Sequence, residues 1–508
     1  ATRVSWGAIR LPSPQVVQQA LEWLLGVAAS FIVMTGLLIT WSEAIPTFLR
    51  RDPPALALTI VTAGIAALSP VAIITLAAVA VLFVLIYNRL LLGVMLVIFW
   101  SAFFMTDLDL LIQAFAVVEI CFALTVAALI ARSMVAWAQH RRDPESYPPP
   151  ERPRLIPLDG LVLAFVAIAF LSLTWVEFWS QATREVRIMI LEPALFYALL
   201  RLMRLERRDL LWLADTLIFT GAAIAVMGFY LYITGQSVVE TDEGAGRLLS
   251  VYGSPNGVGL YLGRCLPFAL AYVLLPFDSL RRGYGAVAAA IMLLAVLFSQ
   301  SRGAILLGIP AAVAAVLLAW RGRRALVPLT IVAVAGVLIV LPLTLVLPRI
   351  GDLTGDTAFF REHLWYSSVN LIREKPLTGV GPDQFLYWYR SRYLLPEAWE
   401  EPDLRVPHNV LLNHWVALGV LGVLAGIAFQ AAYWRKLWHV YQCLDKTDLL
   451  RFALVLGLFG SMADFLAHGL VDVGYFSINL AFVFFLSLGM LYHLAHPSEQ
   501  PAPDEERV

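Results

Sequence analysis

The chain has 508 residues, of which 60% are hydrophobic and only 14% are charged. Soluble globular domains have nearer half apolar and a quarter charged residues, so this composition excludes an ordinary soluble domain and predicts an integral membrane protein. The formal net charge of −1 gives no reason to expect a nucleic-acid partner. The three cysteines are scattered along the chain and imply no disulfide framework.

The N-terminal region, residues 1–138, is predicted to form transmembrane helices. Its first apolar run begins near Trp23 and lacks the small-residue cleavage site of a signal peptide, so we expect a retained span. Residues 55–105 fit either two long helices or three short ones, with breaks near Ser69-Pro70 and Asn88-Arg89. The Pro-rich stretch at 139–157 then predicts a solvated cytoplasmic linker.

The rest of the chain alternates between apolar runs and clusters of basic residues. Many runs reach the roughly 20 residues that a helix needs to cross a bilayer. Basic clusters mark cytoplasmic loops, and two apolar runs separate each consecutive pair of clusters. The predicted spans lie near 159–178, 184–203, 209–233, 256–277, 284–300, 303–320, 325–347, 409–432, 450–468 and 474–494.

This threading predicts an all-α fold, a polytopic transmembrane helical bundle of about 14 spans within a range of roughly 12 to 15. A long extracytoplasmic loop interrupts the bundle and is expected to contain amphipathic helices at 359–374 and 382–395. Its aromatic side chains suit stacking against sugars and lying on the headgroup layer equally well. The predicted divisions are a transmembrane core at 158–347, the loop at 348–408, C-terminal transmembrane helices at 409–495 and a cytoplasmic tail at 496–508.

The turn Ser301-Arg302 joins two predicted spans on the outer face. Ser301 is placed to cap the next helix, whose N-terminus offers free N–H groups and the positive end of its dipole. Arg302 beside it completes a candidate site for a phosphate group. The alternative is an interfacial arginine that extends its side chain to the headgroup layer.

A second helix N-terminus on the same face follows Arg247. Ser254 is a predicted N-cap and Pro255 fits the first helical position, while Arg247 lies in the preceding loop and can reach the same anion. An ordinary entry from a loop into a helix is the alternative, and the local sequence alone favours it.

Pro407-His408-Asn409 opens a third helix on this face. A nearby positive dipole end disfavours imidazolium, so we expect a neutral His408, which is the form that a general base requires. A lone histidine is more often structural. His468 and Asp472 lie four residues apart near the last outer turn, where the carboxylate can hold an arginine, pair with a histidine or face water.

The sequence lacks a Walker-type P-loop, an HExxH motif, a CxxC pair and a GxSxG elbow. ATP hydrolysis, a zinc site and a serine-hydrolase mechanism therefore have no support, and we expect neither a metal nor a cofactor. A secondary transporter or a flippase for lipid-linked sugars is an alternative from another class. The sequence shows no convincing internal repeat, which weakens the transporter interpretation. The candidate motifs also lie at helix ends and not at mid-span. A non-catalytic scaffold in an envelope assembly is a third interpretation.

In their order and common sidedness, these elements resemble the O-antigen ligase and O-antigen polymerase superfamily of polytopic membrane glycosyltransferases, over roughly residues 160–490. One departure is Gly253-Ser254, which stands where the family has other residues before Pro-Asn. The elements that carry the resemblance are Arg247 with Pro255-Asn256, Ser301-Arg302-Gly303-Ala304, Arg361 and Trp365 followed by Pro376 to Pro382 and Phe385, and His408-Asn409 with Leu412, Gly419 and Gly422.

The resemblance implies metal-independent transfer of a glycan from an undecaprenyl-diphosphate-linked donor to a sugar hydroxyl, on the outer face of the bacterial inner membrane. The acceptor would be a glycolipid: lipid A-core in a ligase, which we favour slightly, or another lipid-linked repeat unit in an O-antigen or exopolysaccharide polymerase. No cofactor is implied, and the remaining partners are membrane lipids. By position, the implied roles are His408 as catalytic base, Arg302 and Arg247 as ligands of the diphosphate with Arg184 and Arg187 as further candidates, and Arg361, Asn409, Asp472 and His468 as supporting residues.

Overall fold

The computed structural model of the chain describes residues 52–69, 71–110, 113–147, 149, 154–239, 246–346 and 356–496. Helices account for most of these residues, in agreement with the predicted all-α class. The predictions for the apolar run near Trp23, for residues 348–355 of the long loop and for the tail after His496 lie outside the described residues.

Contacts divide the chain into two compact units, and the first holds the N-terminal helices. It contains α2 (Asp52–Leu68), α3 (Ala72–Asn88), the first residues of α4 (Leu90–Ala102) and the larger part of α5 (Val117–Arg142). Residues 55–105 thus form three helices, the second of the two predicted alternatives. A small apolar cluster that includes Leu85 packs within this unit.

The second unit contains the helices that follow the Pro-rich stretch. Every predicted span from 159 onward coincides with one of these helices or with a continuous run of two or three of them, because apolar runs near 20 residues have the length of a transmembrane helix. The helices of this unit are α6 (Pro157–Ser172), η2 (Leu173–Trp175), α7 (Trp179–Glu185), η3 (Val186–Leu191), α8 (Glu192–Leu202), α9 (Arg207–Ile233), α10 (Pro255–Leu274), α11 (Ser279–Ser299), η4 (Ala304–Gly308), α12 (Ile309–Arg321), η5 (Gly322–Ala325), α13 (Leu326–Val346), α15 (Asp356–Glu374), α16 (Phe385–Trp388), η6 (Tyr389–Tyr393), η7 (Pro396–Ala398), α17 (Val410–Cys443), α18 (Leu449–Gly469) and α19 (Ile478–Ala495).

Within the described ranges, nine helices are long and apolar enough to cross a membrane. The run Ala304–Leu338 counts as one of the nine, although Gly322 ends α12 within it by adopting a φ of +57°. The stretch from α7 to α8 is not among them. The predicted total of about 14 spans, which includes the N-terminal region, stays a prediction.

Two small sheets depart from the all-α prediction. β1 (Asp107–Leu110) pairs with β2 (Gln113–Ala116), and β3 (Val238–Val239) pairs antiparallel with β4 (Arg247–Leu248). Strands of two to four residues are too short to produce a recognisable alternation of apolar and polar side chains. The second hairpin matters for the site because β4 carries Arg247.

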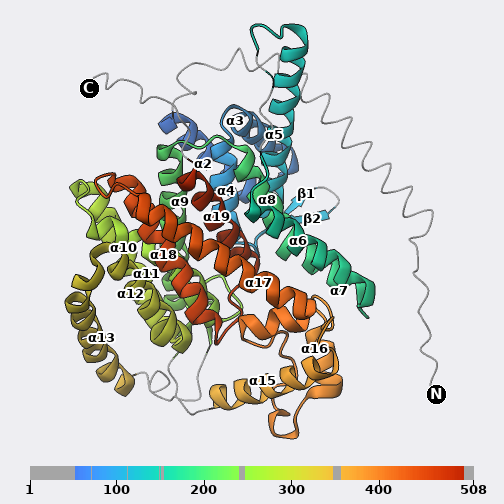
Figure 1. Ribbon diagram of the computed structural model, residues 1–508, viewed down its shortest axis with the longest axis vertical. Helices are drawn as coiled ribbons and strands as arrows, with labels where there is room; N and C mark the ends of the chain where they lie inside the picture. Colours follow the sequence, from blue (N-terminus) through green and yellow to red (C-terminus); the bar gives the residue numbers. More distant parts are fainter. Residues whose placement is uncertain are drawn as a thin grey trace. The chain divides into compact units, whose positions relative to one another are not determined.

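Helices lie at both stretches predicted as amphipathic, in α15 and in the α16–η6 run. Their apolar faces pack together around Leu364, Trp388 and Tyr389 and against Val416 of α17. The backbone N–H of Val380 also donates to the carbonyl of Val416, 2.8 Å away. Figure 1 shows α15 and α16 (orange) together beside the N-terminal end of α17. The side of the membrane on which they lie stays a prediction.

Glycines allow α10, η4 and α18 to approach closely. A Cβ added to Gly263 of α10 or to Gly308 of η4 would lie only 2.3 Å from Oδ1 of Asp464 on α18. Small residues at such contacts are the usual way in which transmembrane helices pack. Asp464 is fully buried there and pairs with Arg264, whose Nε lies 3.2 Å from its Oδ2. This close contact between the helices therefore encloses an ion pair.

Candidate active site

His408 precedes α17 and is bound by a carboxylate from another loop. Its Nδ1 lies 2.9 Å from Oδ1 of Asp472, which belongs to the segment between α18 and α19. Burial would raise the pKa of the Asp472 carboxyl. The positive charge that His408 carries when it is protonated, its hydrogen bond and the charge of Arg361 outweigh burial and hold this pKa well below its usual range. An ionised carboxylate only accepts hydrogen bonds, so Nδ1 is the donor. In the neutral ring, Nε2 is then left as a proton acceptor.

Helix α15 fixes both loops of this dyad. Arg361 places a guanidinium nitrogen 3.2 Å from Oδ2 of Asp472, and the indole N–H of Trp365 donates to the carbonyl of Pro407 at 3.0 Å. These two residues are four apart, which puts them on one face of the helix. The same helix face therefore holds the carboxylate and the backbone immediately before His408.

Asn409 links the two loops directly. Its side-chain oxygen accepts from the backbone N–H groups of Leu411 and Leu412, as expected for the N-cap of α17, and its amide donates to the carbonyl of Leu470 at 2.8 Å. His408 itself has a φ of 49°, in the left-handed region that residues other than glycine rarely adopt. Contacts on both sides of His408 thus fix a backbone conformation that is unfavourable by itself.

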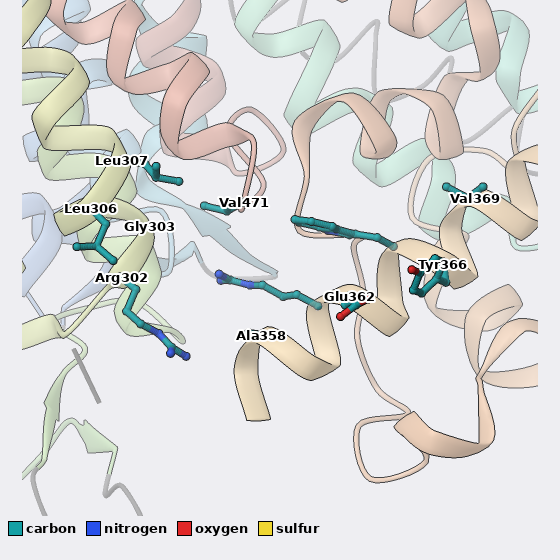
Figure 2. A pocket seen from close by; sticks show the side chains of 11 residues that line it. Arg302, Gly303, Leu306, Leu307, Ala358, Glu362, Tyr366, Val369 and Val471 are labelled. Atoms are coloured by element: carbon teal, nitrogen blue, oxygen red, sulfur yellow. The ribbon is translucent and has the colours of Figure 1, made fainter. Parts of the chain in front are cut away.

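A cavity of about 710 Å³ lies between η4 and α15, within the second unit. Figure 2 shows Arg302, Leu306 and Leu307 on one wall, and Glu362 and Tyr366 on the other. Arg361 and Trp365 also line it, so two guanidinium groups and two aromatic side chains border one space. Neither His408 nor Asp472 is among its lining residues, but Arg361 connects the cavity to the dyad through its ion pair with Asp472.

Arg247 supports the turn that carries Arg302. Its Nε donates to the carbonyl of Ser299 at 3.0 Å, and another guanidinium nitrogen lies 3.4 Å from the side-chain oxygen of Asn256. The side-chain amide of Gln300 donates in return to the carbonyl of Gly246. Arg247 is buried and does not line the cavity. The structure therefore places it behind the Arg302 turn and not beside Arg302 in the cavity.

The two predicted caps differ in outcome. Ser254 caps α10 by accepting from the backbone N–H of Asn256 at 3.3 Å, with Pro255 at the first helical position. The predicted cap by Ser301 is wrong, because within the described residues its buried hydroxyl has no hydrogen-bond partner. That hydroxyl packs against Gly259 of α10, where an added Cβ would lie 3.0 Å from it. Packing against α10 has therefore taken the side chain away from the helix N-terminus.

Three further predicted residues lie outside the cavity. His468 is fully buried on α18 and packs under the Arg302 turn, where a Cβ on Gly303 would lie 2.8 Å from its Nε2. Arg187 places one guanidinium nitrogen 2.8 Å from Glu119 and from Glu192. Arg184 lies near Asp383; burial raises the pKa of that carboxyl, and the charges of Arg405 and Arg184 oppose the rise. The roles predicted for Arg184 and Arg187 stay predictions.

Sequence reasoning did not assign Trp365, Tyr366 and Glu362 to the site. The signal for Trp365 was available, because its spacing of four from Arg361 puts both on one helix face. Nothing local marks Glu362 or Tyr366, which reach the cavity only through the way α15 packs. Within the described part of the chain, no group of three His, Cys, Asp or Glu side chains is placed to hold a metal ion.

The central part of this unit matches a known protein family. Residues 287–427 match a family model described as O-Antigen ligase. This stretch contains the Arg302 turn, Arg361 and Trp365 of α15, and His408 with the first half of α17. No curated protein matches the chain. The motif resemblance is thus confirmed over residues 287–427, which match the O-antigen ligase family model and contain three of the four elements. The element formed by Arg247 and Pro255-Asn256 lies outside the matched stretch.

Proposed function

We propose that the protein transfers a glycan from a lipid-diphosphate-linked donor to a sugar hydroxyl, with His408 as the general base. The observation that carries the proposal is the His408–Asp472 pair at 2.9 Å, backed by Arg361. Within the O-antigen ligase domain, this is a histidine whose proton-accepting Nε2 is defined by a buried, ionised carboxylate on Nδ1.

The proposed step forms one bond and breaks one. The oxygen of the acceptor hydroxyl attacks the anomeric carbon of the donor, and the bond from that carbon to the diphosphate oxygen breaks. Nε2 of His408 takes the hydroxyl proton, and the Asp472 carboxylate stabilises the positive charge that the ring gains. The lipid diphosphate departs with the electron pair of the broken bond and with increased negative charge.

Arg302 and Arg361 are the proposed ligands of the departing diphosphate. They line the same cavity, whose volume of about 710 Å³ suits a diphosphate with one or two sugars. Fixed positive groups bind the developing charge more strongly than the charge of the bound donor, so they stabilise the transition state. Trp365 and Tyr366 in the same wall supply faces for stacking against sugar rings. Arg247 is proposed to position the Arg302 turn through the carbonyl of Ser299.

The positions of the basic clusters predict that this cavity lies on the outer face of the membrane, where a lipid-linked glycan would be met. A ligase joining the glycan to lipid A-core and a polymerase joining lipid-linked repeat units would use the same chemistry. The product distinguishes them: glycan attached to the core glycolipid, or a longer polyprenyl-linked chain.

His408→Ala tests the base. In proteoliposomes with a lipid-linked oligosaccharide donor and a core glycolipid acceptor, we expect transfer to fall by about 10²- to 10⁴-fold. His140→Ala is the matched control, because His140 lies in the last turn of α5 with its Nδ1 2.7 Å from the carbonyl oxygen of Tyr147, and it does not line the cavity. If His408→Ala keeps full activity, the assignment of His408 as the general base is wrong, whichever product is formed.

Arg302→Gln tests the diphosphate site. The loss of a charge-assisted hydrogen bond of about 1.5–3 kcal/mol should lower kcat/KM for the donor by roughly 10- to 150-fold. Its dependence on acceptor concentration should change little. The exposed Arg323→Gln carries the same change of charge and serves as the control. An unchanged donor dependence in Arg302→Gln would exclude this arginine from the donor site.

A further inference from the structure

A second cavity lies at the other end of α17. It has a volume of about 360 Å³ and is bordered by the first residues of α6, the last third of α17 and the end of α19. Its basic and imidazole side chains are Arg435, Lys436, His439 and His496, and its apolar side chains include Leu158 and Leu491. The proposed transfer reaction uses none of these residues.

The charge of this cavity has one sign. No Asp or Glu is among the described residues that line it. The carboxylate at the start of α6, Asp159, is already engaged: it accepts from Arg201 at 2.8 and 2.9 Å and from the hydroxyl of Tyr197 at 2.7 Å. The guanidinium of Arg201 in turn stacks on the ring of Tyr492, 3.7 Å from its centroid, which fixes one wall. The cavity is therefore built for an anion.

The apolar side chains of the cavity indicate which class of anion fits it best. A free phosphate would fill the basic side and leave Leu158 and Leu491 against water, whereas a phospholipid would cover both. The adjacent surface of α17 is apolar as well, since Ile427 and Trp438 are each 52% exposed. An acyl chain leaving the cavity would thus continue along apolar side chains.

The position along α17 fits a headgroup layer. α17 is interrupted at Gly419, whose φ of 68° is not helical. At about 1.5 Å per residue, its two helical parts between Asn409 and Lys436 together cover at most roughly 40 Å. A bilayer measures about 40–45 Å including its headgroup regions. If His408 faces one headgroup layer, Arg435 and Lys436 face the other, which the basic-cluster rule assigns to the cytoplasm.

We propose that this cavity binds the phosphate headgroup of an anionic phospholipid of the cytoplasmic leaflet. Arg435 and Lys436 neutralise the phosphate, His439 and His496 contact it from the sides, and one acyl chain lies along Leu158 and Leu491. Basic pockets between transmembrane helices on the cytoplasmic side commonly hold such headgroups. The proposal rests on the predicted orientation of α17 and is independent of the proposed transfer reaction.

The test compares lipids on the purified full-length chain in a neutral detergent. Thermal unfolding and native mass spectrometry are recorded with phosphatidylglycerol, with phosphatidylcholine of the same acyl chains, and with inorganic phosphate. We expect phosphatidylglycerol alone to raise the Tm and to remain bound. In Arg435→Gln/Lys436→Gln, its affinity should fall about tenfold or more, because each basic residue near a headgroup layer contributes roughly a fivefold gain. Arg323→Gln/Arg324→Gln, equal in charge change but outside the cavity, should match the wild type.

Four outcomes would overturn the proposal. One is equal binding of both lipids by the wild type, and another is an equal loss in both double variants. Stabilisation by inorganic phosphate as large as that by phosphatidylglycerol would assign the site to a free anion. A further variant replaces Asp504, Glu505 and Glu506 of the tail by their amides. If phosphatidylglycerol binds only to that variant, the acidic tail and not a lipid is the ligand of the cavity. None of these readouts uses glycan transfer, so they fail or succeed separately from the proposed function.

Discussion

Two arginine–aspartate pairs of the second unit have the same distance between nitrogen and oxygen but differ in how far they are exposed. Arg264 and Asp464 lie 3.2 Å apart between α10 and α18, with side chains 4% and 0% exposed. Arg361 and Asp472 also lie 3.2 Å apart, but the Arg361 side chain is 19% exposed and lines a cavity. The other carboxylate oxygen of Asp472 accepts a hydrogen bond from His408. The first pair is closed by glycines, whereas the second has a titratable partner and access to a ligand. An ion pair in a membrane protein therefore becomes a candidate site only when its surroundings are open.

Breaking the enclosed pair should give the largest effect, and the effect should be on stability. Arg264→Met leaves Asp464 buried without its partner and also removes the donors to the carbonyls of Ser461 and Gly474. Loss of one member of a buried pair costs about 3–5 kcal/mol. We expect a large fall in Tm in detergent, while the folded fraction keeps its activity per molecule.

The double variant Arg264→Met/Asp464→Leu provides the control. It adds an apolar side chain with the branched shape of Asp to the first change and removes the uncompensated charge, so it should recover part of the lost Tm. A double variant that folds well but has no activity would show that this pair also serves the reaction. The comparison between the two pairs would then be wrong.

The open pair should give the next largest effect, and this effect should be on the rate. Asp472→Asn removes the negative charge that stabilises the protonated ring of His408, and an amide nitrogen turned toward Nδ1 would donate and leave the ring proton on Nε2. We expect kcat to fall by about 10²- to 10³-fold with little change in donor KM. Asp403→Asn is the matched control, since Asp403 forms an exposed pair with Arg390.

The pH profile distinguishes a positioning role from a structural one. The pKa of Asp472 lies well below its usual range, so its carboxylate stays ionised throughout the interval in which histidines titrate. The acid limb of the wild-type profile should therefore report a histidine. If the transfer rate of Asp472→Asn has the same magnitude and the same dependence on pH as that of the wild type, the assigned role of Asp472 is wrong.

Local chemistry was predictable from the sequence, and pairing across the chain was not. The Asn409 and Ser254 N-caps depend on backbone N–H groups two or three residues away, and the spans depend on runs of apolar residues. The His408–Asp472 pair joins positions 64 residues apart and exists only because α15 holds both loops. Sequence position suggested that Asp472 could pair with a histidine, and it did not say which one.

The predicted cap by Ser301 is wrong for a physical reason of the same kind. Ser301 has the residue type and position of a cap, but close contact with Gly259 of α10 directs its hydroxyl elsewhere. Arg187 lies at the predicted start of a span, and its guanidinium also binds Glu119, which is distant in sequence, while its predicted role stays a prediction. Both contacts are made with another helix, and the neighbouring residues in the sequence do not indicate them.

Trp365→Phe should give the smallest of these effects and tests how the open pair is held. The substitution keeps an aromatic ring in the cavity wall and removes only the indole N–H that donates to the carbonyl of Pro407. A hydrogen bond of this kind contributes about 1 kcal/mol, so kcat should fall by no more than roughly tenfold. Trp399→Phe is the control, because Trp399 is 67% exposed and does not line the cavity. If the loss appears in kcat, the hydrogen bond positions His408 for proton transfer. If it appears only in KM for the sugar substrates, Trp365 acts by stacking, and the backbone before His408 needs no support from α15.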